Sequence, residues 1–245
     1  MSTSIGGIPL TPEAPRVIVP IMGADLEAIA REATAIAATD ADLVEWRADR
    51  FDDLASTDAA QEAAALIRQT VQRPIIVTVR TVDEGGFFAG DADAYAAAIM
   101  AIDHRADAVD IELRHPHALE LIDATTARGC PVIASCHILD STPDEATMIE
   151  LLEHAEATPA AIGKLAVQAT SPADAAALLH ATAVHTARSS KPVITMAMGD
   201  HGVITRLIGH VFGSCATFAT VVEASAPGQP SLAQLRRVWA DLRPR

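Results

Sequence analysis

Lysine and aromatic residues are both scarce in this chain of 245 residues. Aromatic side chains make up 3% of it while half of the residues are hydrophobic, which favours a buried, alanine-rich core over a disordered chain. The 18 basic residues face 32 acidic ones, so the formal net charge is −14. Because nucleic-acid binding needs a basic surface, no nucleic-acid partner is expected. Only two of the basic residues are lysines, Lys164 and Lys191.

Cysteine is also rare. Cys130, Cys136 and Cys215 form an odd number without CxxC spacing, so neither a disulfide framework nor a zinc site is indicated, and reduced thiols are expected. Residues 1–15 lack the features of a signal peptide, and no stretch approaches the ~18 apolar residues of a membrane span. No HExxH or comparable ligand spacing occurs, so no metal is expected. These absences predict a cytoplasmic protein without a membrane partner.

Short apolar runs rich in β-branched residues recur eight times along the chain. They lie at residues 17–19, 43–46, 75–79, 109–113, 132–134, 162–167, 193–196 and 216–218. Alanine-rich segments with helical spacing separate them, and the runs start roughly 22 to 34 residues apart, as parallel crossovers through helices require. The pattern predicts an α/β fold, a single (β/α)₈ TIM barrel domain over residues 16–245. Residues 1–15 form a short N-terminal extension and are a candidate cover for the barrel bottom.

A doubly wound open sheet would use the same alternation of strands and helices. The phosphate-loop signatures GxGxxG and GxxxxGK[ST] are absent, which favours the barrel. Helix starts agree with either fold. Thr142 to Glu145 and Ser231 to Gln234 have capping-box spacing, and Ser171-Pro172 places proline at a first helical position.

Lys164 lies inside an apolar run, at a place where a barrel gathers its functional side chains. Lysine is almost never buried unless it is paired or functional. Desolvation frees the amine to attack a carbonyl, as in Schiff-base lysines. The alternative is that Lys164 reaches water at a strand end or pairs with a carboxylate such as Glu112. Lys191 stands in a turn before a strand, where we expect it to be solvated.

His137 follows a strand next to the one that carries Lys164, so its imidazole could transfer protons near the lysine. Glu84, in a glycine-flanked loop, is a candidate to hold the ring. A lone histidine after a strand is also commonly structural, and that alternative stays open. Met196 and Met198 belong to the seventh strand unit and are candidates for the pocket wall.

Arg47, Arg80 and Arg206 are placed near the same rim. Guanidinium groups bind carboxylates in a bidentate manner, so three of them around a lysine suggest a small anionic ligand. Alternatively each arginine pairs with a nearby acid, as Arg47 could with Glu45 or Asp49. The loop from Ser225 to Pro230 could close on a ligand or be an ordinary connection.

The polar motifs at these strand ends resemble those of type I 3-dehydroquinate dehydratases in order and spacing. The similarity runs from about Val17 to the end of the chain. The motifs are Glu45-Trp46-Arg47, Thr78-Val79-Arg80, Glu84-Gly85-Gly86, Ser135-Cys136-His137, Gly163 to Val167, Ile194 to Gly199, Gly202 to Leu207, Val211 to Ser214 and Ser225 to Gln229.

The resemblance implies a Schiff-base dehydratase without a cofactor, which converts 3-dehydroquinate to 3-dehydroshikimate. Lys164 matches the lysine that condenses with the C3 ketone, His137 the proton-transfer residue, and Glu84 the carboxylate that orients the histidine. The remaining matches surround the substrate: Arg206, Gln229 and the adjacent Ser225 at its carboxylate, with Glu45, Arg47 and Arg80 around the ring hydroxyls and the lysine. The family also suggests a homodimer.

The chain departs from the family pattern at two places. Ile138-Leu139 replaces an acidic and an aromatic residue after the histidine, and Pro20 stands where a small hydroxyl residue is frequent. Neither change removes a catalytic group. A class I aldolase and a non-catalytic anion-binding barrel remain alternatives from the residues alone. Aromatic biosynthesis and quinate breakdown use the same reaction, so both roles stay open.

Overall fold

The computed structural model describes residues 3–242, so it covers residues 3–15 of the expected extension and 16–242 of the expected barrel domain. Eight parallel strands form one sheet in the order β10-β3-β4-β5-β6-β7-β8-β9. They are β3 (Arg16–Ile21), β4 (Leu43–Arg47), β5 (Ile75–Thr78), β6 (Ala108–Glu112), β7 (Val132–Ile138), β8 (Ile162–Gln168), β9 (Val193–Met198) and β10 (Ala216–Phe218).

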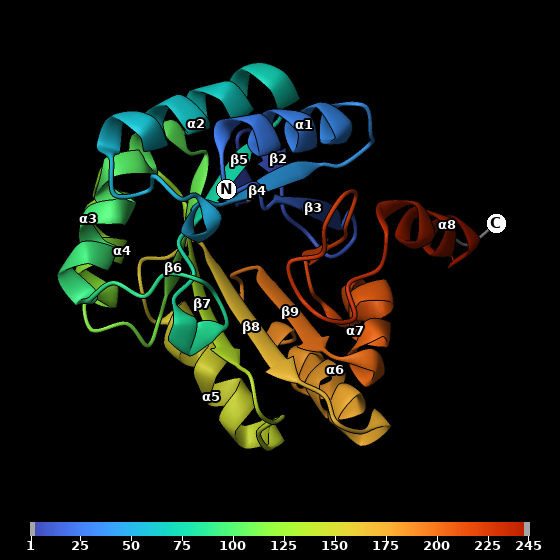
Figure 1. The fold of residues 1–245 in the computed structure, drawn as a ribbon. Coiled ribbons are helices and arrows are strands. Elements are labelled where there is room, and N and C mark those ends of the chain that lie inside the picture. Colours follow the sequence, from blue (N-terminus) through green and yellow to red (C-terminus); the bar gives the residue numbers. More distant parts are fainter. Residues whose placement is uncertain (1–2, 243–245) are drawn as a thin grey trace.

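The sheet closes on itself between its first and last members. The Cys215 amide beside β10 donates to the Val193 carbonyl of β9 at 2.8 Å, and Val193 forms a parallel bridge with Ser214. Helices surround the strands (Figure 1). They are α1 (Leu26–Ala37), α2 (Thr57–Val71), α3 (Ala92–Ile102), α4 (Ala118–Ala127), α5 (Glu145–Glu156), α6 (Pro172–Thr186), α7 (Val203–Ile208) and α8 (Leu232–Leu242). The predicted barrel is confirmed.

The alternation of side chains along β8 explains how a lysine enters the barrel interior. Ile162 and Ala166 pack in the inner apolar cluster, whereas Leu165 and Val167 pack outward with residues of α5 and α6. Successive side chains of a strand point to opposite faces, so Lys164 shares the inner face with Ile162 and Ala166. Its place in the interior is therefore fixed by strand register.

The first residues of the described chain form a two-stranded hairpin, β1 (Ser4–Ile5) and β2 (Ile8–Pro9). Ile5 and Leu10 are buried in the inner cluster with residues from the start of the barrel strands, such as Ile18 and Leu43. The hairpin therefore packs at the end of the barrel where the strands begin.

The helix starts agree with the sequence at two of three places. Ser171 caps α6 in a reciprocal capping box with Asp174, and Pro172 is the first helical residue. Ser231 and Gln234 exchange hydrogen bonds in the same way. The prediction for Thr142 is wrong, because Asp144 caps α5 and the Thr142 hydroxyl donates to the Gln168 carbonyl. No helix among residues 3–242 is long and apolar enough to cross a membrane.

Candidate active site

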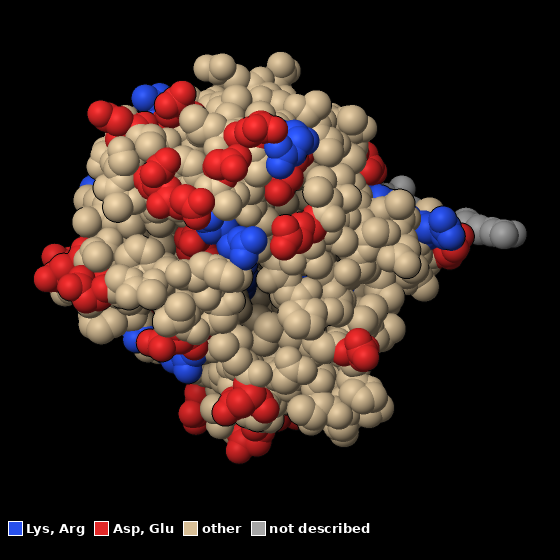
Figure 2. All heavy atoms as spheres, in the orientation of Figure 1, with Lys and Arg blue, Asp and Glu red and all other residues tan. Residues whose placement is uncertain are grey.

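A cavity of about 270 Å³ opens where the barrel strands end, close to the lower limit of about 300 Å³ that is common for small-molecule pockets. Figure 2 shows basic side chains gathered at a hollow near the middle of this face, with acidic ones spread around it. Ten of the eleven predicted site residues line the cavity: Glu45, Arg47, Arg80, Glu84, His137, Lys164, Met196, Met198, Arg206 and Ser225.

Lys164 is 6% exposed, and its ammonium group has a carboxylate partner. Nζ lies 2.8 Å from Oδ2 of Asp110 on β6 and 3.9 Å from Oε1 of Glu45. It also lies 4.8 Å from the centre of the Phe218 ring. The carboxylate that sequence reasoning offered as a partner was Glu112, and that assignment is wrong. Glu112 accepts instead from Arg80 and from the amide and hydroxyl of Thr81.

Asp110 is the centre of a buried network that joins three strands. Its Oδ1 atom accepts from Arg80 Nη2 at 2.7 Å and from the Ser135 hydroxyl at 2.6 Å, while Oδ2 accepts from Lys164. Burial alone would raise the pKa of the Asp110 carboxyl. The cations of Arg80 and Lys164 outweigh burial and hold that pKa well below its ordinary value. The network therefore contains an ionised carboxylate beside the lysine.

His137, near the end of β7, is paired with Glu84 from the turn after β5. Its Nδ1 lies 2.8 Å from Glu84 Oε2, and its backbone amide donates to the same oxygen at 3.1 Å. Burial, together with the cations of Arg80 and Lys164, lowers the pKa of His137 well below its ordinary value. The imidazole is therefore neutral at pH 7. When Glu84 is ionised it accepts Nδ1–H, and Nε2 then carries the free lone pair.

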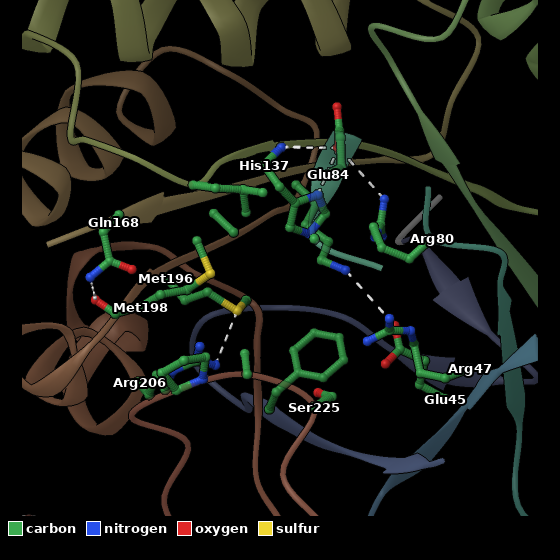
Figure 3. A pocket seen from close by; sticks show the side chains of 17 residues that line it. Glu45, Arg47, Arg80, Glu84, His137, Gln168, Met196, Met198, Arg206 and Ser225 are labelled. Carbon is green, nitrogen blue, oxygen red and sulfur yellow. Dashed lines mark hydrogen bonds and ion pairs between the residues drawn. The ribbon is translucent and has the colours of Figure 1, made fainter. Parts of the chain in front are cut away.

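Arg206 of α7 is 2% exposed and differs from the other pocket arginines in having no carboxylate partner among the described residues. Its Nη1 lies 3.3 Å from the Met196 sulfur, and its buried Nε atom has no hydrogen-bond partner. Burial lowers its pKa to about 10. In Figure 3 Arg206 lies across the cavity from Arg80 and His137. An uncompensated buried guanidinium at a cavity wall is a receptor for an anion.

Arg47 has the acidic partner that sequence reasoning kept as an alternative. Its Nε and Nη2 atoms donate to the two Asp49 oxygens at 2.8 and 2.7 Å. Glu45 accepts from the Thr78 hydroxyl at 2.9 Å. Both residues line the cavity while they make these contacts.

Gln229 is the one predicted site residue that does not line the cavity. Its Oε1 accepts from the amide and hydroxyl of Ser225 at 2.8 and 3.2 Å, and its buried Nε2 has no partner. Ser225, Ala226 and Pro227 line the cavity. Gln229 therefore stabilises the loop that contains Ser225 through hydrogen bonds within that loop.

The expectation that Lys191 is merely solvated is wrong. Its ammonium donates to the carbonyls of Glu156, Thr158 and Ala160 at 2.7, 2.5 and 3.0 Å, at the last residue of α5 and just after it. This satisfies carbonyl groups that a helix end leaves unpaired. Lys191 is thus a structural residue, remote from the cavity.

Sequence reasoning missed Asp110 and Arg114. Asp110 lies between Val109 and Ile111, so the signal that marked Lys164, a charge inside an apolar strand, also marks Asp110. Arg114 contacts Glu84 and the His137 backbone, and no sequence pattern distinguishes it from other surface arginines. Gln168, which lines the cavity from the end of β8, was also not singled out.

The fold and the cavity together define a class: parallel α/β barrels that hold one buried lysine at the base of a pocket for a small anion. Comparison with known proteins places the chain within that class. The model of the type I 3-dehydroquinase family matches residues 17–243, and the chain belongs to this family.

The relatives agree in sequence and in structure. 3-Dehydroquinate dehydratases of Shigella dysenteriae and Escherichia coli O157:H7 are each 38% identical over 94% of this chain and 93% of their own length. The crystal structure of the Geobacillus kaustophilus 3-dehydroquinate dehydratase aligns with a TM-score of 0.95 and 33% identity. The alignment covers 99% of the present chain and 96% of that enzyme. The crystal structure of the type I enzyme of Clostridium difficile with covalent modified comenic acid aligns with a TM-score of 0.92 and 30% identity. This alignment covers 99% of the present chain and 97% of that enzyme. The resemblance found in the sequence is confirmed.

Proposed function

We propose that this chain is a hydro-lyase that converts 3-dehydroquinate to 3-dehydroshikimate through a Schiff base on Lys164. The observation that carries the proposal is the position of the Lys164 amine, buried in one cavity that is also lined by the neutral imidazole of His137 and by the Arg206 guanidinium, which has no carboxylate partner among the described residues. The family to which the chain belongs supports the choice of substrate.

The first step joins enzyme and substrate. The Lys164 amine, after losing a proton, adds to the C3 ketone, and the resulting carbinolamine loses water to give a protonated imine. That cation withdraws electrons from C2 and makes its proton acidic. Asp110, which lies 2.8 Å from Nζ in the free protein, supplies a negative charge that favours the protonated form.

The second step is the elimination. Nε2 of His137 removes the C2 proton, and the electron pair moves toward the iminium nitrogen. The imidazolium then gives this proton to the C1 hydroxyl, which leaves as water while the C1–C2 double bond forms. Addition of water to the imine releases 3-dehydroshikimate and restores the amine. Glu84 stabilises the transient imidazolium through the Nδ1 contact at 2.8 Å.

The remaining site residues bind the substrate. Arg206 pairs with the substrate carboxylate, because this replaces the missing partner of its guanidinium. Ser225 closes over the same end, on a loop that Gln229 braces. Glu45, Arg47 and Arg80 surround the ring hydroxyls and the lysine, and Met196 and Met198 form the apolar wall.

Borohydride reduction in the presence of 3-dehydroquinate tests the proposal. The imine should be trapped as a stable adduct on the peptide that contains Lys164, and absorbance of the conjugated product should grow without borohydride. Lys164→Ala should abolish the adduct, while Lys191→Ala, the matched control, should leave it intact. No adduct and no product would falsify the dehydratase and favour a non-catalytic anion-binding barrel. Trapping only with a phosphorylated sugar would favour a class I aldolase.

A second variant separates imine formation from proton transfer. His137→Ala keeps the Lys164 amine and the Arg206 guanidinium, so borohydride should still trap a substrate adduct. Turnover should fall by about 10² to 10⁴, the usual contribution of a general acid–base residue. Trapping without loss of turnover would remove His137 from the mechanism.

We also propose a homodimer in the cytoplasm. Ile204 of α7 and Val211 in the following turn are 44% and 67% exposed and lie on two elements that contact each other, and a contiguous apolar patch there would suit a partner surface. Cys136 and Cys215 are buried, free thiols, which suits a reducing compartment. Light scattering of the protein and of Val211→Glu tests the dimer, and cell fractionation tests the compartment.

A further inference from the structure

Arg114 lies two residues after the end of β6 at Glu112, and its side chain is half exposed at the rim of the barrel. Its Nε donates to Glu84 Oε1 at 3.0 Å, and its Nη2 donates to the His137 carbonyl at 2.6 Å. It is absent from the cavity lining. Arg114 therefore contacts two residues assigned to proton transfer without facing the substrate.

The two carboxylate oxygens of Glu84 accept hydrogen bonds from different residues. Oε1 accepts from Arg114, while Oε2 accepts from both the ring and the backbone amide of His137. His137 is thus held at its amide and its ring by Glu84, and at its carbonyl by Arg114. One guanidinium joins the loops that follow β5 and β6 to the end of β7.

Arg80 does not replace Arg114 in this arrangement. Its Nη1 lies 3.6 Å from Glu84 Oε2, outside the distance of a strong hydrogen bond. Both of its terminal nitrogens are committed elsewhere, to Asp110, Glu112 and Ser135. Arg114 is therefore the cation that donates a hydrogen bond directly to the Glu84 carboxylate.

The charge state of Glu84 decides which nitrogen of His137 is basic. An ionised carboxylate accepts Nδ1–H and leaves Nε2 free to remove a proton from the substrate. A protonated carboxyl donates to Nδ1 and so favours the tautomer with hydrogen on Nε2, which cannot act as a base. A positive charge that keeps Glu84 ionised therefore keeps His137 in the competent tautomer.

Charged and titratable groups surround Glu84 on three sides. Arg80 lies beyond the end of β5, Glu112 and Arg114 come from β6 and its extension, and Cys136 and His137 from β7. Burial raises the pKa of Glu84 to about 7 even though Arg80 and Arg114 lower it, and Glu112 raises it further. Glu84 thus titrates near neutral pH, where loss of one adjacent cation matters most.

We propose that Arg114 is a positioning residue that holds Glu84 as a hydrogen-bond acceptor and thereby sets the tautomer of His137 and the acidic limit of turnover. The inference rests on the proposed function, because it gives His137 the role of base. It adds a residue outside the cavity to the proton-transfer machinery.

The kcat of Arg114→Gln, measured with 3-dehydroquinate between pH 5.5 and 9, tests this inference. Loss of the cation should move the acidic limb of the kcat profile upward by about one pH unit, which makes kcat about tenfold lower on that limb. Activity should return toward the wild-type value at pH 9, and KM should change less than about twofold, because Arg114 does not face the cavity. Arg114→Lys, which keeps the charge, should restore much of the profile.

Arg68→Gln is the matched control. Arg68 is also partly exposed and also contacts one carboxylate and one backbone carbonyl, those of Asp107 at 2.7 Å and Arg105 at 2.9 Å. Its loss should leave the pH profile unchanged. A purely structural tether at Arg114 would lower kcat equally at every pH, and that result, or a changed KM with an unmoved profile, would overturn the inference.

Nitrogen-15 NMR of the histidine rings gives a readout independent of turnover. At pH 8, where the Glu84 carboxyl of the wild-type protein is mostly ionised, His137 should carry its hydrogen on Nδ1, and Arg114→Gln should shift the signals toward the Nε2–H tautomer. An unchanged tautomer would also overturn the inference. If the wild-type protein does not turn over 3-dehydroquinate, the proposed function fails, while this spectrum still decides the role of Arg114 at the Glu84–His137 pair.

Discussion

The ammonium of Lys164 and the carboxylate of Asp110 lie 2.8 Å apart in the interior of the barrel, and both residues are almost completely buried. Asp110 also accepts from Arg80 and Ser135. One carboxylate thus offsets much of the charge of two buried cations. A lysine on the inner face of β8 is tolerated because β6 provides this partner.

Replacing Asp110 with Asn should strongly destabilise the protein. The amide has no charge, so Arg80 and Lys164 would be left buried without that compensation, and breaking such a pair costs about 3 to 5 kcal/mol. Urea denaturation measures the change. Glu27→Gln is the control, since Glu27 forms an exposed 2.7 Å pair with Arg31, and its loss should cost less than about 1 kcal/mol. Equal costs would contradict the central role of Asp110.

Replacing Arg206 with Met should make the free protein more stable and substrate binding weaker. Removing an uncompensated buried charge should raise the free energy of unfolding by about 1 to 4 kcal/mol. Loss of the carboxylate contact should cost at least about 2 kcal/mol, which raises KM about 30-fold or more. Denaturation and steady-state kinetics check the two effects.

Arg73→Met provides the opposite case. The Arg73 guanidinium donates to several backbone carbonyls, including those of Ile36 and Ala37. Its loss should destabilise the protein and leave KM unchanged. A destabilised Arg206→Met variant with normal KM would show that Arg206 is structural.

The stability of Glu84→Gln relative to wild type should rise with pH. Burial raises the pKa of Glu84 from 4.5 to about 7, so the folded state holds this proton more tightly than the unfolded state does. The stabilisation that the folded wild-type protein gains from this proton is complete below about pH 4.5 and is lost as the pH rises through 7. Glutamine does not titrate, so the difference should grow by about 3 kcal/mol between pH 4.5 and 8. Urea denaturation of both proteins across this pH range measures the difference. If their free energies of unfolding changed in parallel with pH, the prediction would be contradicted.

Gly85→Ala should impair both stability and turnover. Gly85 ends the turn that presents Glu84 with φ of +82°, and an added Cβ would lie 3.1 Å from Leu139 Cδ2. The left-handed backbone costs about 1 to 2 kcal/mol in alanine. Because Gly85 directly follows Glu84, relief of that strain should displace the Glu84 carboxylate and lower kcat several-fold, whereas the exposed Leu139 side chain can move aside. Gly129→Ala has the same backbone strain at φ of +81° and open space around it. It should lose similar stability and keep full activity.

The barrel and most of the pocket could be predicted from the sequence for a common reason. Parallel strands covered on both faces are continuous apolar runs, so a charged residue such as Lys164 inside one is conspicuous. Their carboxyl ends meet at one edge, which brings Arg80 and His137 together although 57 positions separate them in the numbering.

The pairing of charges could not be predicted in the same way. Lys164 has Asp110 and Glu45 within 4 Å rather than Glu112, and this depends on side-chain direction across neighbouring strands. The contacts of Arg114 and Lys191 depend on loop paths. Such paths are set by packing between distant segments, which residue order does not specify.

The hairpin of β1 and β2 has a practical consequence for attachment. It packs at the end of the barrel where the strands begin, so the described chain starts on the side opposite Lys164 and the rim that contains Ser225. A fusion partner or a solid support joined ahead of the hairpin would leave the entrance to the cavity facing away from the support. Immobilised protein should therefore keep its access to substrate.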